Sequence, residues 1–171
     1  MKLRRAHPSD AELLATLARD GFVAAFEHLY AREDLDAFLA AYKTPEAFER
    51  YLARPGHRTA IAEIDGEPVG YCMISTPSEF AEHSDAARPL ALQQLYTAPG
   101  RTGEGIGAAL MDWALDEAEA LGADAVQLSV WSGNHGAQRF YGRYGFGKIA
   151  DIDFWVGNHR DDEFLFELRL D

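Results

Sequence analysis

The stretch LYTAPGRTGEGIGAALMDWALDEAEALG, residues 95–122, decides the fold because it joins a glycine-rich turn to a long helical pattern. Four glycines fall within eight residues, at positions 100, 103, 105 and 107. Glycine loses more backbone freedom on folding than any other residue, so this cluster is costly to order. A helix that begins behind it offers unpaired N–H groups and a partial positive charge. The turn therefore predicts an anion site, most simply for a phosphate; the alternative is a flexible loop that only precedes a helix.

The helix after the turn lies between two expected strands. Residues 89–97, before the turn, and residues 124–131, after the helix, are short apolar runs typical of strands. A strand, a crossover helix and a second strand predict a parallel pair. Gly122 can close the helix. The apolar face of the helix comprises Ile106, Ala109, Leu110, Trp113, Ala114 and Leu121.

The remaining patterns follow an order typical of a mixed α/β sheet. Ser9 and Glu12 have capping-box spacing and predict the start of the first helix. Two further helical patterns break near Thr44-Pro45 and stop at Pro55-Gly56. Asp65-Gly66 predicts a hairpin turn. We expect strands over residues 2–6, 58–64, 69–75, 151–157 and 163–170, and a short helix after residue 134 that ends at Gly145.

The composition predicts one soluble domain. The chain has 171 residues, of which 47% are hydrophobic, and we expect a single domain over residues 1–171. No apolar run approaches the ~20 residues of a membrane helix, and none follows the basic N-terminus as in a secretory signal. Cys72 is the one cysteine, so no internal disulfide can form, and a cytoplasmic location is expected. Its place in an expected strand favours a small buried hydrophobe over a nucleophile.

The net charge and the spacing of the histidines limit the kinds of partner and cofactor that we expect. A formal charge of −12, from 16 basic and 28 acidic residues, argues against binding to nucleic acid or to an anionic membrane. It suits a cationic substrate, with solubility as an equal alternative. The six histidines lack ligand spacing, so no metal site is expected. The turn is not a Walker A loop, because no Lys-Ser or Lys-Thr pair follows it, and its late position disfavours a dinucleotide fingerprint.

Three pieces between residues 92 and 146 resemble the GNAT superfamily of acyl-CoA-dependent N-acyltransferases. The first is the strand, turn and helix of the opening stretch. There Gly105 and Gly107 align with the family's Gln/Arg-x-x-Gly-x-Gly/Ala pattern, while Thr102 departs from its first position. The second is the strand VQLSVWSGN, residues 126–134. The third is NHGAQRFYGRYGF, which matches the signature Asn-x-x-Ala-x-x-x-Tyr-x-x-x-Gly-Phe at Asn134, Ala137, Tyr141, Gly145 and Phe146.

The resemblance implies a fold and a cofactor site. The fold is a mixed, mostly antiparallel sheet of six to seven strands, with a splayed parallel central pair and four to five flanking helices. The main chain of residues 95–97 would pair with pantetheine as an added strand does, and the amides of residues 103–108 would hold the pyrophosphate. For Phe140, plain core packing is an equal alternative. The implied contacts with acetyl-CoA are Leu95, Tyr96, Thr97, Arg101, Thr102, Gly103, Gly105, Ile106, Gly107, Ala108, Asn134, Ala137, Phe140 and Tyr141.

The resemblance also implies part of the chemistry. Tyr141 aligns with the tyrosine that serves as general acid in the family, and a phenol with a pKa of about 10 can protonate a thiolate; a structural tyrosine is the alternative. A backbone N–H near Tyr96 would contact the oxyanion. The general base is open, because Gln93 and Gln94 stand where several family members carry a glutamate. Candidates by location are Glu79, Glu82, His83, Asp85, Glu27, His28 and Tyr30.

We therefore expect an N-acetyltransferase that moves an acetyl group from acetyl-CoA to a primary amine. A small acceptor such as a polyamine is favoured by the acidic charge and by residues 149–170, which are similar to bacterial members related to spermidine and spermine acetyltransferases. One alternative is acetylation of a protein N-terminus or lysine, which needs an open groove. Another is a non-catalytic acyl-CoA sensor, which would keep the turn and lose the acid. Homodimers are common in the family.

Overall fold

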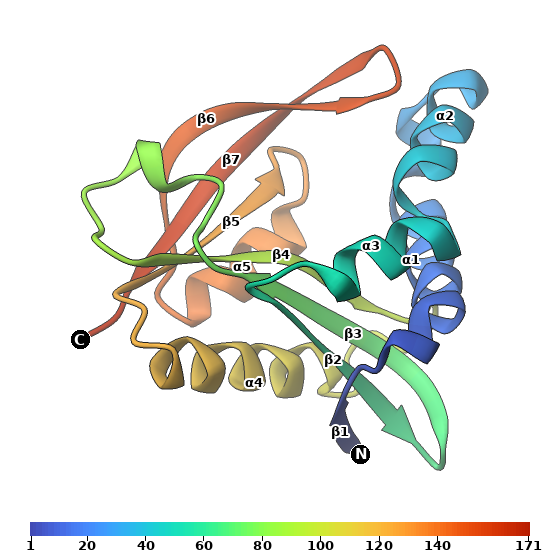
Figure 1. Ribbon diagram of the computed structural model, residues 1–171. Coiled ribbons are helices and arrows are strands. Elements are labelled where there is room, and N and C mark those ends of the chain that lie inside the picture. Colours follow the sequence, from blue (N-terminus) through green and yellow to red (C-terminus); the bar gives the residue numbers. More distant parts are fainter.

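A single seven-stranded sheet, in the order β1-β2-β3-β4-β5-β7-β6, organises the chain in a computed structural model that describes residues 1–171 (Figure 1). Neighbouring strands are antiparallel except β4 and β5, which are parallel and central. The strands are β1 (Lys2–Arg5), β2 (His57–Ile64), β3 (Glu67–Ser75), β4 (Pro89–Thr97), β5 (Ala125–Trp131), β6 (Gly147–Val156) and β7 (His159–Arg169). The mixed sheet and its parallel central pair are confirmed.

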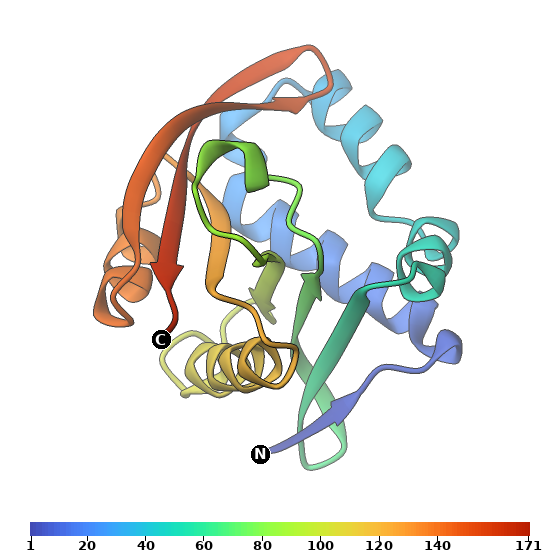
Figure 2. The same cartoon turned by 60° about the vertical axis from the view of Figure 1, so that its left-hand side comes forward.

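Five α-helices cover the two faces of the sheet (Figure 2). They are α1 (Ala11–Phe26), α2 (Arg32–Tyr42), α3 (Pro45–Ala53), α4 (Ile106–Ala120) and α5 (His135–Arg143). Side chains of α4 and α5 form the largest core cluster with one face. Those of α1, α2 and α3 form two smaller clusters with the other face. Strand β3 is buried on both sides, which explains its unbroken apolar run VGYCMIS.

The parallel strands β4 and β5 part after three residue pairs. Pro89, Leu90 and Ala91 pair with residues 125–127, and no pairing follows. Beyond that point β4 stays paired with β3, and β5 stays paired with β7. A bulge at Gln93 marks the divergence, because Met73 faces Gln94 while the next residue of β3 faces Leu92. A bulge increases local bend and twist, and here it turns β4 away from β5.

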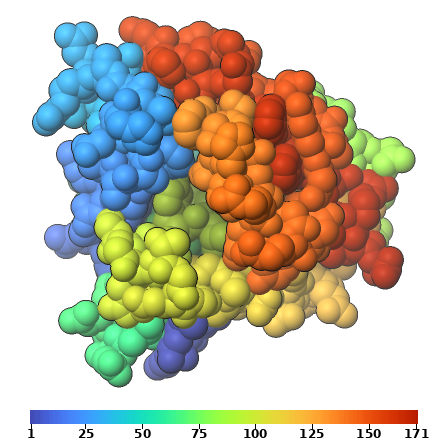
Figure 3. All heavy atoms as spheres, turned by 180° about the vertical axis from the view of Figure 1, so that it is seen from behind, coloured from blue at the N-terminus to red at the C-terminus, as the bar shows by residue number.

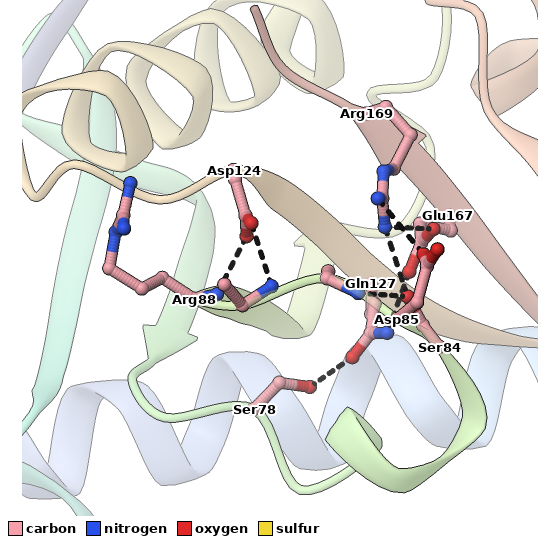
Figure 4. Close-up of polar contacts among 10 residues, drawn as sticks. Ser78, Ser84, Asp85, Arg88, Asp124, Gln127, Glu167 and Arg169 are labelled. Atoms are coloured by element: carbon pink, nitrogen blue, oxygen red, sulfur yellow. Dashed lines mark hydrogen bonds and ion pairs between the residues drawn. The ribbon is translucent and has the colours of Figure 1, made fainter.

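The space between the parting strands β4 and β5 forms a wedge, and polar contacts hold its closed end together (Figure 4). The backbone N–H groups of Ala87 and Arg88 donate to the Asp124 carboxylate at 2.7 and 2.8 Å. The Ser78 hydroxyl donates to Gln127 at 2.7 Å, and the Gln127 amide donates to Glu167 at 2.8 Å. These bonds tie the β3–β4 loop to β5 and β7. The wedge therefore opens at the opposite end, toward the glycine turn.

The start and end of α4 follow from glycine. Gly105 at its N-terminus has a φ of 80° and Gly122 at its C-terminus a φ of 70°, a region that L-residues rarely adopt. The Ala123 N–H bonds to the Ala118 carbonyl at 3.0 Å, which completes the C-terminal cap and confirms the role of Gly122. Gly145 closes α5 in the same way, with a φ of 95°.

The start of the first helix differs from the prediction. Ser9 and Glu12 do not form a capping box, because Pro8–Asp10 is a separate 3-10 turn and α1 begins at Ala11. Asp10 precedes α1 but makes no capping bond to it: its carboxylate accepts the His7 backbone N–H at 2.7 Å, within the 3-10 turn, and binds the Arg4 guanidinium at 2.8 Å. That carboxylate joins the start of α1 to β1, and the Arg4 side chain lowers its pKa.

The β6–β7 hairpin is longer than predicted and reaches α2 (Figure 1). The two strands extend over residues 147–156 and 159–169, joined by Gly157 and Asn158. The Asn158 N–H donates to Asp34 of α2 at 2.9 Å, and Val156 is buried against α1 and α2. The hairpin and α2 therefore close one side of the space above the wedge.

No helix in the structure combines the length and the apolarity needed to cross a bilayer.

We predict that Gly157→Ala weakens the contact between the hairpin and α2. A Cβ at Gly157 would lie 2.6 Å from Cα of Asp34, whereas a Cβ at Gly66, which also has positive φ, meets nothing within 4 Å. Both changes carry the backbone cost of about 1–2 kcal/mol. Gly157→Ala should lose a further ~1–3 kcal/mol from the overlap. Denaturant unfolding of both variants measures the difference, and equal losses would contradict the contact.

Candidate active site

The glycine turn presents unpaired backbone N–H groups at the start of α4. Its conformation needs glycine at two positions, since Gly103 has a φ of 88° and Gly105 a φ of 80°. No side chain caps the helix, and no acidic residue lies in its first turn. The amides of residues 106–108 have no intrahelical acceptor, because the first helical N–H groups of any α-helix lack one. The turn is therefore built to receive an anion, as the sequence predicts.

The charged and polar side chains of the turn contribute less. Arg101 forms an ion pair with Glu104 at 2.9 Å, so its guanidinium is engaged within the turn. Thr102 is exposed and caps nothing. Free donors at the turn are therefore supplied by the backbone rather than by these side chains.

The structure brings the third predicted motif, NHGAQRFYGRYGF, against this turn. A Cβ built at Gly107 would lie 3.7 Å from the ring of Phe140, so α5 lies beside the start of α4. Tyr141 and Ile106 belong to one core cluster, with Ala137 and Phe140 packed at its edge. Figure 3 shows a hollow between the N-terminal helices, the turn and α5, with residues of the central sheet at its bottom.

Strand β4 offers a free backbone edge to this hollow. The Ala98 N–H bonds to Val69 of β3 at 2.8 Å. Antiparallel pairing alternates, so Tyr96 directs its N–H and C=O toward β3 as well. Leu95 and Thr97 direct their N–H and C=O groups to the opposite edge of β4, where β5 is no longer paired with it. The oxyanion contact expected near Tyr96 therefore falls to the N–H of a neighbouring residue.

Tyr141 has a hydroxyl without a protein partner. Tyr141 is only 9% exposed, but its hydroxyl oxygen is still accessible and makes no hydrogen bond within the protein. Burial raises its pKa, and the charges of nearby groups, Glu163 among them, add to that rise. The phenol therefore stays protonated at neutral pH and faces accessible space. Tyr96 is similar, because burial and Glu163 raise its pKa too.

Asn134 has a clear structural role. Its side-chain oxygen accepts the Ala137 backbone N–H at 3.1 Å and caps α5. A capping side chain fixes the start of a helix and satisfies one of its free donors. Asn134 thus positions Tyr141 through α5, whatever contact it makes with a ligand.

Glu163 is the acidic residue at the wedge that the sequence analysis missed. It lies on β7 opposite Trp131 of β5 and is 8% exposed. It lines a cavity of about 450 Å³, and Ser129 beside it lines a second of about 210 Å³. The sequence pattern predicts that this strand begins at residue 163, which would leave Glu163 at its exposed end. In the structure the strand begins at His159, so alternation places Asp161, Glu163 and Leu165 on one buried face.

Most base candidates named from the sequence lie elsewhere. The Gln94 side-chain oxygen accepts bonds from the Tyr71 hydroxyl at 2.6 Å and the Lys43 ammonium at 3.1 Å. Asp85 pairs with Arg169 at 3.0 Å in the network of Figure 4. Four further candidates are exposed, namely Glu27, His28, Glu82 and His83. Tyr30 donates to Asp161. Glu79 and Gln93 line the smaller cavity.

Cys72 and metal chemistry do not enter the site. Cys72 is fully buried, and burial raises the pKa of its thiol, which disfavours the reactive thiolate. No group of three or more His, Cys, Asp or Glu side chains is arranged to hold a metal ion.

Comparisons with known proteins agree with this geometry. The acetyltransferase (GNAT) family model matches residues 18–146. An uncharacterized N-acetyltransferase of Mycobacterium bovis is 33% identical over 95% of this chain and 99% of its own. The aminoalkylphosphonate N-acetyltransferase of Salmonella typhimurium is 35% identical over 59% of this chain and 64% of its own. The PaiA N-acetyltransferase of Thermoplasma acidophilum, solved with coenzyme A, superposes with a TM-score of 0.81 at 20% identity, covering 99% and 98% of the two chains.

We predict that Gly105→Val weakens coenzyme A binding, because a side chain at the residue just before α4 would occupy the approach to its free amides. Gly105 has a φ of 80°, so the change also costs about 1–2 kcal/mol of backbone strain. The matched control is Gly66→Val in the β2–β3 turn, which has a φ of 82° and, like Gly105, no atom within 4 Å of an added Cβ. Calorimetry with coenzyme A should separate the two variants, and equal affinities would exclude the turn from the binding site.

Proposed function

The chain belongs to the acetyltransferase (GNAT) family and is an N-acetyltransferase that uses acetyl-CoA, and we propose that it acetylates a small cationic primary amine with Tyr141 as general acid. The observation that carries the proposal is the wedge between β4 and β5. It lies between the glycine turn on one side and a cavity lined by Glu79 and Ser129 on the other. A donor held at the turn and an acceptor held in this cavity would meet there.

The donor side fits a nucleotide thioester. The free amides of residues 106–108 would hold its diphosphate. The pantetheine amides would bond to the open edge of β4 at Leu95 and Thr97, as an added strand does. This arrangement leads the thioester to the point where the strands part. Much of the rate enhancement would come from holding the two reactants in position there.

Tyr141 suits the role of acid. Its hydroxyl is free of protein partners and its raised pKa keeps it protonated at neutral pH. The sulfur of coenzyme A would take this proton as the C–S bond breaks. An N–H of β4, from Leu95 or Thr97, would stabilise the negative charge that develops on the carbonyl oxygen.

The acceptor side suits a small cation. A cavity of about 210 Å³, lined by Glu79 and Ser129, lies on the same face of the sheet as the Glu163 side chain. The other acidic side chains of the larger cavity lie on the opposite face, away from α1. Glu79 and Glu163 have no ion-pair partner. Two free carboxylates favour an acceptor with one or two positive charges, such as a polyamine. The β6–β7 hairpin closes against α2 through Asn158, which disfavours a peptide lying across the site.

We predict that Tyr141→Phe lowers kcat by roughly 10²-fold while leaving coenzyme A affinity nearly unchanged, because the phenyl ring keeps its packing and loses only the proton. Steady-state kinetics and calorimetry measure the two effects. Tyr144→Phe is the matched control, since the Tyr144 hydroxyl bonds to Asp112 at 3.2 Å, on the surface of α4. Weaker binding with unchanged turnover would make Tyr141 a structural residue.

We predict that polyamines and other small diamines are the best acceptors in an assay of thiol release from acetyl-CoA. The panel should include aminoglycosides, amino acids, aminoalkylphosphonates and peptides with a free N-terminus or lysine. An acidic lining repels a phosphonate, so a preference for aminoalkylphosphonates would contradict the proposed acceptor, and a preference for peptides would favour a protein substrate.

A further inference from the structure

On the basis of the proposed transfer to an amine, we propose that Glu163 is the general base that takes the proton from the acceptor. Acetyl transfer needs a neutral amine, and the strand β4 carries glutamines where an acid could have stood. Glu163 comes instead from β7, two strands away in the sheet order. Its position, surroundings and neighbours each support this role.

Its position follows from sheet register. Glu163 pairs with Trp131 of β5 and with Ile152 of β6, so it lies in a central row of this half of the sheet. The Trp131 ring meets Phe26 of α1 edge-on at 6.4 Å, which shows that this face looks toward α1. Trp131 also lies beyond the last residue of β5 that pairs with β4. Glu163 therefore borders the open part of the wedge.

Its surroundings leave the carboxylate free but not isolated from solvent. It has no ion-pair partner, and the Ser129 hydroxyl is its one hydrogen-bonding neighbour. The cavity of about 210 Å³, which Ser129 and Ile152 line on the same face of the sheet, adjoins it and gives water or a substrate access. Burial raises the pKa of Glu163 to about 7, the charge of Asp161 adds to the rise, and Ser129 opposes it. A base whose pKa lies near the working pH can both accept and release a proton.

Acid and base would approach from opposite faces of the sheet. Tyr141 belongs to the core on the α4–α5 side. Glu163 lies on the α1 side, yet its charge contributes to the raised pKa values of Tyr141 and Tyr96. The two groups are therefore near enough for their charges to interact. The titratable groups that face Glu163 are Asp161 on β7, Tyr30 after α1, Tyr96 on β4 and Tyr141 on α5.

Other buried ionisable groups fit the role less well. Both oxygens of Asp161 are occupied, one by Tyr30 and the other by His159 at 3.1 Å. Lys43 donates to Gln94, lies against the rings of Phe22, Phe38 and Tyr96, and lines neither cavity. The ring nitrogens of His57 are buried without a partner, but His57 lies on β2, two strands from β4.

The proton balance closes with these two residues. The acceptor ammonium gives one proton to Glu163, and the freed lone pair forms the N–C bond to the acetyl carbon as the C–S bond breaks. The departing sulfur takes the Tyr141 proton. The second proton of the attacking nitrogen returns to Tyr141, and Glu163 releases its proton to water in the cavity. The products are an amide, coenzyme A thiol and one proton.

We predict that Glu163→Gln lowers kcat/KM by about 10²-fold or more for a strongly basic amine, with coenzyme A affinity unchanged. In the native enzyme, activity should rise with pH through about 7 as the carboxylate ionises. This rise should be absent in Glu163→Gln. The loss should shrink for weakly basic amines, which are already neutral at the assay pH, and Glu163→Asp should recover part of the activity. Stopped assays across pH 5.5–9 with an amine series, and calorimetry with coenzyme A, measure these effects.

Asp162→Asn is the matched control, because it removes the neighbouring carboxylate of the same strand, which is exposed on the opposite face and pairs with Arg160 at 2.7 Å. Its activity and pH profile should match the native enzyme. A loss in Glu163→Gln that is equal for strongly and weakly basic amines would make Glu163 an acceptor-binding residue, and an unchanged pH profile would overturn its role as base. In either case native acetylation of amines and the Tyr141→Phe effect would stand. If the native enzyme acetylated no amine, the proposed function itself would fail.

Discussion

The parting of β4 from β5 is the constraint on which the rest of the structure depends. A sheet is stable because each backbone N–H and C=O finds a partner. Here the partners end after Ala91 and Gln127, and each strand is held only by its outer neighbour. The bonds around Asp124 and Gln127 keep the other end shut. The opening is therefore local, and it leaves a backbone edge that a ligand can complete.

The polar groups around the opening are unlike those elsewhere in the molecule. Asp10 and Asp124 accept bonds from backbone or arginine donors, and their pKa values are lowered. Tyr141, Tyr96 and Glu163 lack such partners, and burial raises their pKa values. A buried polar group without a partner costs about 1–3 kcal/mol. Such a cost is typical of functional sites, where reacting groups must stay free for the substrate.

Features encoded by neighbouring residues could be predicted well. The order of strands and helices, the parallel pair, the glycine turn and the end of α4 at Gly122 are all confirmed. The predicted capping box of α1 was wrong, because the 3-10 turn Pro8–Asp10 precedes the helix and no side chain caps it. The buried acid Glu163 was missed, because strand β7 begins four residues earlier than its apolar run indicates.

The sequence by itself determined the fold class, the family motifs and the glycine turn before α4, since each depends on residue types at short, regular spacing. Only the tertiary structure decided which ionisable groups share the site. Glu163 and Tyr141 come from different elements and lie close because β5 and β7 pair while β4 departs. Their pKa values depend on burial and on charges brought near by folding. The sequence pattern alone gives neither this burial nor these nearby charges, because both arise from contacts between residues far apart in the chain.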